Sequence, residues 1–256
     1  MTFDPDTIAC AAMTEKSDPD RFAATMSLPV AARAKLFPLW AFNIEVARAP
    51  WVTKEPLIAE MRLQWWHDAL DEIAARGFVR RHEVVTPLAT LLSPAQAESL
   101  TGLVAARKRD IEKTFFEDEA ALWQYLDATA GTLHWGAASL LGAPAADEGA
   151  VRKAARAMAL ANWMCALPEL EARGKQPLPD GRPETLQRLA REALAGLAAQ
   201  RSLSKASRQA LLSGFQSRAI LKQVVAAPTR VAQNRLHAAP LKRSARLIRA
   251  RMTGRI

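Results

Sequence analysis

Two neighbouring stretches decide the fold: Trp40-Ala-Phe-Asn-Ile-Glu-Val-Ala-Arg-Ala-Pro50 and Glu60-Met-Arg-Leu-Gln-Trp-Trp-His-Asp-Ala-Leu-Asp-Glu-Ile73. In the second stretch apolar residues recur at helical spacing, which predicts an amphipathic helix. The adjacent Trp65 and Trp66 point about 100° apart on such a helix. One of them can therefore enter the core while the other walls a cleft or contacts a neighbouring helix, although aromatics at helical spacing are usually core residues.

The composition favours helices along the whole chain. The sequence has 256 residues, half of them hydrophobic, which suits one large domain or two small ones. Alanine is abundant and runs of β-branched residues are scarce, so helix is favoured over strand. No strand-like alternation and no fixed-period repeat is found. We therefore expect an all-α domain of about ten helices.

Prolines, caps and charge divide the chain into three parts. Residues 1–17 are expected to be loosely ordered, residues 18–237 to form the main domain, and residues 238–256 to form a basic tail. Within the domain, Pro38 is expected to kink or split one helix. Pro168 is expected to end another helix ahead of a loop, since proline removes a backbone donor.

The charge is unevenly distributed. The formal net charge is +9, and 13 of the 35 Lys and Arg residues lie in 201–256, which contains no Asp or Glu. Such a basic segment indicates an anionic partner: a membrane surface, nucleic acid or an acidic protein face. No transmembrane helix, secretory signal or transit peptide is predicted. Two cysteines without metal-ligand company suit a reducing compartment, so a cytoplasmic location is expected.

Four pieces of sequence, in order, resemble the squalene/phytoene synthase family. They are Arg21-Phe22 with Leu36–Arg48, the run Met61-Arg-Leu-Gln-Trp-Trp-His-Asp-Ala-Leu70, the run Ala130-Gly-Thr-Leu-His-Trp-Gly136, and Ala157–Met164 followed by Arg173-Gly-Lys-Gln-Pro-Leu-Pro179. The Arg-Leu-Gln-Trp-Trp run is the most specific piece. The resemblance implies the all-α isoprenoid synthase fold, a single domain of helices around a central prenyl-binding cavity. On that fold the residues expected to line the cavity are Phe42, Trp65, Trp66, Trp135 and Trp163.

The chemistry of that family requires acidic residues at two places. Coupling of prenyl diphosphates ionises an allylic diphosphate, whose charge Mg²⁺ ions neutralise through oxygen ligands. The family supplies two Asp-x-x-x-Asp pairs on facing helices, and carboxylates four residues apart share a helix face. Counting along the family pattern places Ala47, Arg48 and Trp51 at the first pair, and Ala166 and Leu170 at the second. The resemblance therefore implies a lost Mg²⁺–diphosphate site, and we expect no metal and no other cofactor.

An active enzyme that uses displaced acids is the alternative. Its candidate catalytic residues are Glu45, Asp68, Asp110 and Glu169, and at least three carboxylates would have to converge on the cavity to hold Mg²⁺. Each has a simpler interpretation as a solvated charge, as does the i, i+3 pair of Asp68 and Asp71. His67 and His134 are expected to be structural, because no Cys, Asp or second His is found at ligand spacing.

The C-terminal tail has the pattern of a basic amphipathic helix. Leu241, Ala245, Ile248 and Met252 follow helical spacing, and basic residues take most of the remaining surface: Lys242, Arg243, Arg246, Arg249 and Arg251. Helices of this kind lie on anionic bilayers, where each basic group contributes about 1 kcal/mol. A solvated terminal helix is the alternative. No nucleic-acid partner is expected, because aromatic residues are not interleaved and no binding motif appears.

The leading interpretation is a non-catalytic, membrane-proximal member of the family, cytoplasmic and peripheral at the inner membrane face. The Ala-Phe-Asn-x-Glu and Met-Arg-x-Gln-(Trp/Phe)-Trp runs resemble a degenerate branch related to the mitochondrial respiratory complex I assembly factor. That resemblance implies a respiratory-complex subunit or assembly protein as partner, and a prenyl lipid as possible ligand. The alternative is an active head-to-head prenyl-diphosphate transferase of the squalene/phytoene synthase type, with Mg²⁺. A hydrophobic-ligand carrier without chemistry is the third interpretation.

Overall fold

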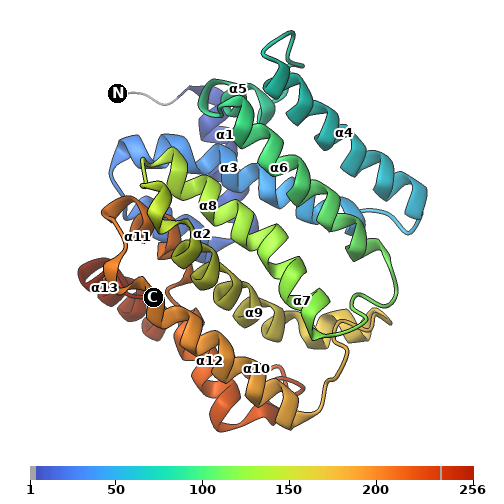
Figure 1. Ribbon diagram of the computed structural model, residues 1–256, viewed down its shortest axis with the longest axis vertical. Coiled ribbons are helices and arrows are strands. Elements are labelled where there is room, and N and C mark those ends of the chain that lie inside the picture. The colour runs from blue at the N-terminus through green and yellow to red at the C-terminus, as the bar shows by residue number, and fades with distance from the viewer. Residues whose placement is uncertain (1–3, 237) are drawn as a thin grey trace.

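The computed structural model describes residues 4–236 and 238–256, which form one all-α assembly (Figure 1). Within those ranges no strand is present, and one isolated β-bridge joins Thr114 to Gln176. The all-α fold that the sequence predicts is therefore confirmed.

The helices follow one another through short connections. Their bounds are α1 Pro5–Ser17, α2 Pro19–Met26, α3 Val30–Arg48, α4 Pro56–Ala75, α5 Val85–Leu91, α6 Pro94–Ala106, α7 Glu119–Leu126, α8 Thr132–Leu140, α9 Glu148–Ala172, α10 Pro183–Gly196, α11 Lys205–Leu211, α12 Ser217–Ala226 and α13 Pro240–Thr253. A π-helical turn, Asp127–Gly131, joins α7 to α8. Among the described residues no helix has the length and apolar character needed to cross a bilayer.

Helix α3 lies at the centre of the core. Its sequence is apolar nearly all round, which is typical of a helix surrounded by others. Phe37, Trp40 and Phe42 are at most 1% exposed, and α1, α2, α5 and α8 pack against the helix. The indole Nε1 of Trp40 donates a hydrogen bond to Thr25 Oγ1 at 3.0 Å, which satisfies its one polar group. Helix α3 is therefore the scaffold on which the N-terminal half is built.

Both prolines that were expected to interrupt helices lie inside continuous ones. Helix α3 runs through Pro38 without a break, and α9 runs through Pro168 to Ala172. The prediction that Pro168 ends its helix is wrong, because a missing proline N–H removes only one hydrogen bond and the next turn still closes. The Arg173 N–H donates to the Glu169 carbonyl at 3.1 Å. Glu169 therefore lies on a regular helical turn.

The N-terminal segment is also more ordered than expected. Residues 5–17 form α1, which packs on α3, so the prediction of a loosely ordered segment is wrong from Asp4 onward, and residues 1–3 lie outside the described residues. The Asp4 carboxylate caps the helix by accepting the Thr7 N–H at 3.0 Å. The helix buries small side chains, including Cys10 and Thr14, in place of a stripe of large apolar ones. That is why its sequence lacks a clear amphipathic pattern.

The basic tail forms α13, which is anchored on the domain at the edge of the molecule beside α12 (Figure 1). Arg243 Nε donates to Asp20 Oδ1 at 3.0 Å, and Arg246 Nη1 donates to Gln216 Oε1 at 2.8 Å. Ala250 is buried. Three large apolar residues of the helix point to solvent instead, with exposed fractions of 83%, 61% and 81%: Leu241, Ile248 and Met252.

Candidate functional site

A central cavity of about 400 Å³ lies among α2, α8, α9 and α12. Small-molecule sites in proteins commonly have volumes of about 300–1,000 Å³. One part of the wall is apolar and includes Leu126, Leu133, Met158, Trp163 and Ile220. Another part is polar and includes Asp18, Asp20, Arg21, Asn43, His134 and Gln216. The cavity is therefore suited to a ligand with both an apolar and a polar end.

The aromatic residues predicted to line this cavity are distributed differently. Trp163 lies in its wall. Phe42 is fully buried and packs edge-on against Trp66, with ring centres 5.5 Å apart. Trp65 and Trp66 line a separate groove of about 480 Å³ on the surface. Trp135 is half-buried against the hydrophobic core and lies outside the lining. The prediction is wrong for these four, because helical periodicity identifies a buried face without telling core from cavity.

His134 is held as a neutral side chain in the cavity wall. Its Nδ1 lies 2.9 Å from the Ala130 carbonyl oxygen, and its Nε2 lies 3.3 Å from Ser213 Oγ. Burial, and then the positive charge of Arg21, lower the pKa of His134 to about 4. A neutral ring donates from Nδ1 and accepts at Nε2, which satisfies both nitrogens. This geometry fits the structural role expected from the sequence.

A second pocket, of about 310 Å³, brings together four of the five positions that the resemblance aligns with acidic residues, whereas the fifth, Arg48, lines the groove beside α4. Ala47 comes from α3, Trp51 from the 3-10 turn Ala49–Trp51, and Ala166 and Leu170 from α9. The pocket adjoins the central cavity, since Arg107, Trp163 and Ala166 line both. We call it the α3–α9 pocket. The two segments therefore face each other, as the family resemblance implies.

The counted positions of the α3–α9 pocket carry no carboxylate, and two cations lie beside Trp51 at its wall. The Arg173 guanidinium lies 5.3 Å and the Lys175 ammonium 5.5 Å from the ring centre of Trp51, within the range of cation–π attraction. Arg173 also pairs with Glu169 at 2.5 Å. Lys175 Nζ donates to the carbonyls of Asp110, Ile111 and Glu112 at 3.2, 2.8 and 2.6 Å. These three bonds use all the donors of the ammonium group.

A buried polar triad closes one side of the same pocket. The Tyr125 hydroxyl donates to Asp110 Oδ1 at 2.5 Å, and Arg107 Nη1 donates to Asp110 Oδ2 at 3.1 Å and to the Tyr125 oxygen at 2.8 Å. Burial raises the pKa of the Asp110 carboxyl, and the charge of Arg107 opposes this rise. Burial also raises the pKa of Tyr125 well above its ordinary value. Asp110 is therefore engaged on both oxygens within the protein.

The four displaced acids do not converge. Asp110 and Glu169 line the α3–α9 pocket, whereas Glu45 lines the groove beside α4 and pairs with Arg48 at 3.3 Å. Asp68 is exposed and accepts a hydrogen bond from Gln64 Nε2 at 2.7 Å. A Mg²⁺ site built on at least three of these carboxylates is therefore absent from the described residues.

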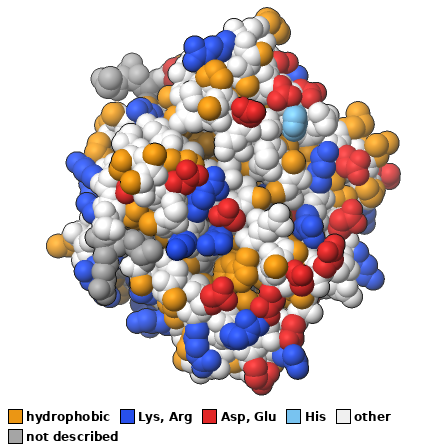
Figure 2. Space-filling model, viewed as in Figure 1, with side chains coloured by type: hydrophobic (Ala, Val, Ile, Leu, Met, Phe, Trp, Pro, Cys, Tyr) orange, Lys and Arg blue, Asp and Glu red, His pale blue; other side chains and the backbone are white. Residues whose placement is uncertain are grey.

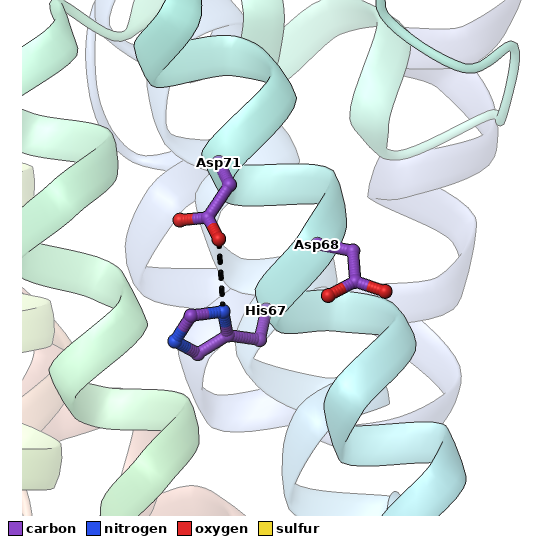
Figure 3. A group of neighbouring side chains, drawn as sticks. All are labelled: His67, Asp68 and Asp71. Atoms are coloured by element: carbon purple, nitrogen blue, oxygen red, sulfur yellow. Dashed lines mark ion pairs between the residues drawn. The ribbon is translucent and has the colours of Figure 1, made fainter.

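A group of metal-ligand type does occur elsewhere, on the surface of α4. His67, Asp68 and Asp71 each offer one ligand atom, and these atoms lie within 4.8 Å of one another (Figure 3). His67 Nδ1 lies 3.2 Å from Asp71 Oδ2. The expectation that His67 has no Asp at ligand spacing is therefore wrong, because i, i+4 residues share a helix face. The group is largely exposed and lies outside the linings of the cavity and the α3–α9 pocket, and an ordinary surface pair accounts for it.

The groove beside α4 agrees with the interpretation that one tryptophan enters the core while the other walls a cleft, since Trp66 is buried and Trp65 is half-buried. Arg80 lies over Trp65, with the guanidinium 4.8 Å from the ring centre. Hydrophobic side chains are visible at the edge of the molecule where α4 begins (Figure 2). Four large apolar residues there are exposed: Val52, Leu57, Ile58 and Met61. Exposure of this kind interrupts the apolar stripe that the sequence assigns wholly to the core.

Comparison with known proteins places these features in a family. A family model described as squalene/phytoene synthase matches residues 14–241. The NADH dehydrogenase (ubiquinone) complex I, assembly factor 6 homolog of Drosophila melanogaster is 33% identical over 131 residues, 48% of this chain and 39% of that protein. The human complex I assembly factor 6 is 31% identical over 64 residues, 25% of this chain and 19% of that protein. The matched part is thus less than half of either relative.

Solved structures share the fold across nearly the whole chain. A dehydrosqualene synthase in complex with a ligand superimposes with a TM-score of 0.71 at 14% identity, covering 96% of this chain and 95% of the other. Squalene synthase HpnC from Alicyclobacillus acidocaldarius has a TM-score of 0.66 at 16% identity, covering 90% and 95%. At such identities the likeness concerns the fold alone, which is the isoprenoid synthase fold expected from the sequence. The match of the family model over residues 14–241 shows that the chain belongs to the squalene/phytoene synthase family.

Proposed function

We propose that this chain is a non-catalytic member of its family that acts at a membrane in the assembly of a respiratory complex. The observation that carries the proposal is the content of the α3–α9 pocket. Trp51 lies there within cation–π distance of Arg173 and Lys175, at a position where the resemblance implies a Mg²⁺-binding carboxylate. A divalent cation is repelled by such neighbours, so ionisation of a prenyl diphosphate lacks its neutralising metal.

The cations of the pocket are poor substitutes for the metal. Lys175 already donates to three backbone carbonyls, and Arg173 is paired with Glu169. Arg107 is bound to Asp110 and Tyr125. A diphosphate could recruit these groups only by breaking existing hydrogen bonds, which costs roughly 1–3 kcal/mol for each charged group involved. Because these cations already have partners, the pocket supports a loss of catalysis and not a mechanism in which cations replace the metal.

The relatives support the assembly role. Two of them are named complex I assembly factor 6, and the regions matched include part of this chain only. We propose a subunit or assembly protein of a respiratory complex as the partner. The exposed apolar and basic side chains of α13 support a peripheral position, on the cytoplasmic side of the inner membrane.

Prenyl-lipid binding is the second candidate. It rests on the central cavity, whose apolar wall around Leu133, Met158 and Ile220 fits a hydrocarbon chain and whose volume is about 400 Å³. Native mass spectrometry of protein purified without organic solvent tests it. A bound polyprenyl species is expected under this candidate, and an empty cavity in protein that still supports assembly removes it.

Deletion of the gene tests the assembly role. Native gels of membranes from deleted cells are expected to show less assembled complex I, and the wild-type gene is expected to restore it. A triple variant, Glu45→Gln with Asp68→Asn and Glu169→Gln, removes the three acidic candidates outside the buried triad and leaves the triad intact. Full restoration by this variant is expected. Undiminished complex I after deletion would refute the assembly role, and failure of a stably folded triple variant would favour the displaced-acid enzyme.

A further inference from the structure

A third cavity, of about 370 Å³, lies between α12 and α13 and is strongly basic. We call it the α12–α13 pocket. Its lining combines five basic side chains, Arg218, Lys222, Arg246, Arg249 and Arg255, with five apolar residues, Leu197, Ala198, Phe215, Ala219 and Ile256. No acidic residue is among them. The pocket is therefore complementary to an anion that also carries apolar groups.

The basic residues of this pocket fall into two groups. Arg246 and Arg218 help to build the wall: Arg246 donates to Gln216, and Arg218 Nε donates to a main-chain oxygen of Ile256 at 3.1 Å. Lys222, Arg249 and Arg255 are exposed at the rim. The rim cations are thus accessible to a ligand from outside the molecule, whereas Arg173 of the α3–α9 pocket, although also exposed, is paired with Glu169.

The pocket opens beside the exposed apolar stripe of α13. At about 100° per residue, Leu241, Ile248 and Met252 lie on one face of the helix. Lys242 and Arg249 lie on the flank between that stripe and Arg246, which points to the pocket. On the view of Figure 2, basic side chains are spread along the edge where α13 lies, while acidic ones gather at the opposite lower side. Apolar stripe, basic flank and basic pocket therefore follow one another across the surface.

We propose that the α12–α13 pocket binds the phosphate headgroup of an anionic phospholipid while the stripe of α13 lies in the bilayer surface. The proposal rests on the membrane location in the proposed function and specifies the lipid class recognised. The rim cations receive the phosphate, and the buried apolar floor of Leu197 and Phe215 receives glycerol and acyl carbons. The stripe buries apolar area in the interface, as amphipathic helices do.

A bilayer suits this surface better than other anions. A nucleic acid would leave Leu241 and Met252 in water, and Phe215, the aromatic residue in the pocket lining, is buried and so not open to base stacking. A free phosphate explains the pocket but not the stripe. A phospholipid surface engages both features at once, because its charged headgroups and acyl chains are layered in the same order as the pocket and the stripe.

Vesicle sedimentation tests the proposal on the full chain. The protein is expected to bind vesicles of phosphatidylcholine with 25% phosphatidylglycerol and not vesicles of phosphatidylcholine alone. The double variant Lys222→Glu with Arg255→Glu is expected to lower the affinity at least about tenfold. The matched control, Lys16→Glu with Lys54→Glu, changes the net charge equally at two exposed sites outside the pocket lining. It is expected to retain binding within about threefold.

Further experiments distinguish phospholipid binding in the α12–α13 pocket from bulk charge attraction and from a site for free phosphate. Leu241→Ser with Met252→Ser is expected to weaken vesicle binding without altering the basic rim. Equal loss in pocket and control variants would overturn the proposal in favour of bulk charge. Displacement by inorganic phosphate at matched ionic strength would overturn it in favour of a free-anion site. Diphosphate release and complex I assembly are measured separately from vesicle binding. A negative vesicle result therefore leaves the proposed function standing. If the proposed function fails instead, the vesicle result still tests lipid binding.

Discussion

The α3–α9 pocket and the α12–α13 pocket are both rich in basic side chains, but they use them in opposite ways. In the first, Arg107, Arg173 and Lys175 are bound to acids, aromatic rings and backbone carbonyls. In the second, Lys222 and Arg255 stand exposed at the rim of a pocket without acidic residues. Positive charge stabilises the fold in one region and remains available to a partner in the other.

This contrast shows that the pocket expected from the family and the surface accessible to partners are two different regions of the molecule. In the family, the α3–α9 region is expected to hold the metal and the diphosphate. Here Arg173 and Lys175 lie over Trp51, and Arg173 is paired with Glu169, so these cations already have partners within the protein. Helix α13, by contrast, exposes large apolar side chains to solvent. Substitutions in the first region should therefore affect stability, and those in the second should affect binding.

The largest effect is expected from Asp110→Ala. Removing this carboxylate leaves Arg107 without its charged partner, and breaking a largely buried pair costs about 3–5 kcal/mol. Asp110→Asn keeps a hydrogen-bond partner for Tyr125 and is expected to cost less. Urea unfolding measures both. Asp68→Ala, on the exposed face of α4, is the control and should stay within about 0.5 kcal/mol of wild type. Similar losses for Asp68 and Asp110 would contradict the structural role of the triad.

The next effect concerns pH and His134. Its pKa of about 4 in the folded protein lies below the ordinary 6.5, so the unfolded chain takes up the proton first as the pH falls. This contribution to stability is full above pH 6.5 and is lost as the pH drops to about 4, by about 3 kcal/mol. His134→Gln is expected to be less stable at pH 7 but to show a flatter dependence in that window. Parallel curves of unfolding free energy against pH would disprove this account.

A smaller effect is expected at Trp51. Trp51→Ala removes a half-buried ring and two cation–π contacts, which together are worth about 1–2 kcal/mol. Trp51→Phe, which keeps a ring for Arg173 and Lys175, should recover about half of the loss. Thermal unfolding of the three proteins at low and high salt provides the measurement. If Trp51→Ala matched wild type, the ring would not be stabilising the closed pocket.

The smallest effect on stability is expected at the α12–α13 rim. Lys222→Glu and Arg255→Glu alter exposed side chains, so the free energy of unfolding should change by no more than about 0.5 kcal/mol. Deletion of α13 is not equivalent, because Ala250 and Ile256 are buried and Arg243 binds Asp20. A large loss of stability in the rim variants, measured by urea unfolding, would indicate that the rim residues stabilise the fold, as those of the α3–α9 pocket do.

The sequence predicted the helical fold and the meeting of its two former acidic segments. The helical fold follows from composition and local periodicity, whereas the meeting of the segments around Ala47 and Ala166 was implied by the family resemblance. Helical spacing predicted that one of Trp65 and Trp66 could wall a cleft, but not that this cleft is an outer groove instead of the central cavity, because periodicity does not tell which neighbours cover a helix face. Helix α1 was missed because it buries small residues such as Cys10. The continuity of α9 through Pro168 was missed because tertiary packing outweighs the local cost of proline.

The α12–α13 pocket illustrates a further limit. The tail residues Arg246 and Arg249 were assigned to an anionic surface from their spacing, but Lys222 and Phe215 lie about 30 residues earlier and reach the same pocket only through the fold. Arg243 and Arg246, assigned to the same surface, also anchor α13 to Asp20 and Gln216. Spacing identifies the helix face, and only packing identifies which charges remain accessible.

The central claim, that the α3–α9 pocket no longer supports prenyl-diphosphate chemistry, is tested most directly by a diphosphate-release assay. Purified full-length protein is incubated with Mg²⁺ and either farnesyl or geranylgeranyl diphosphate, with an active squalene synthase as positive control. The account predicts release no greater than that of a protein-free blank. Sustained Mg²⁺-dependent release that falls in the Glu169→Gln variant would contradict it.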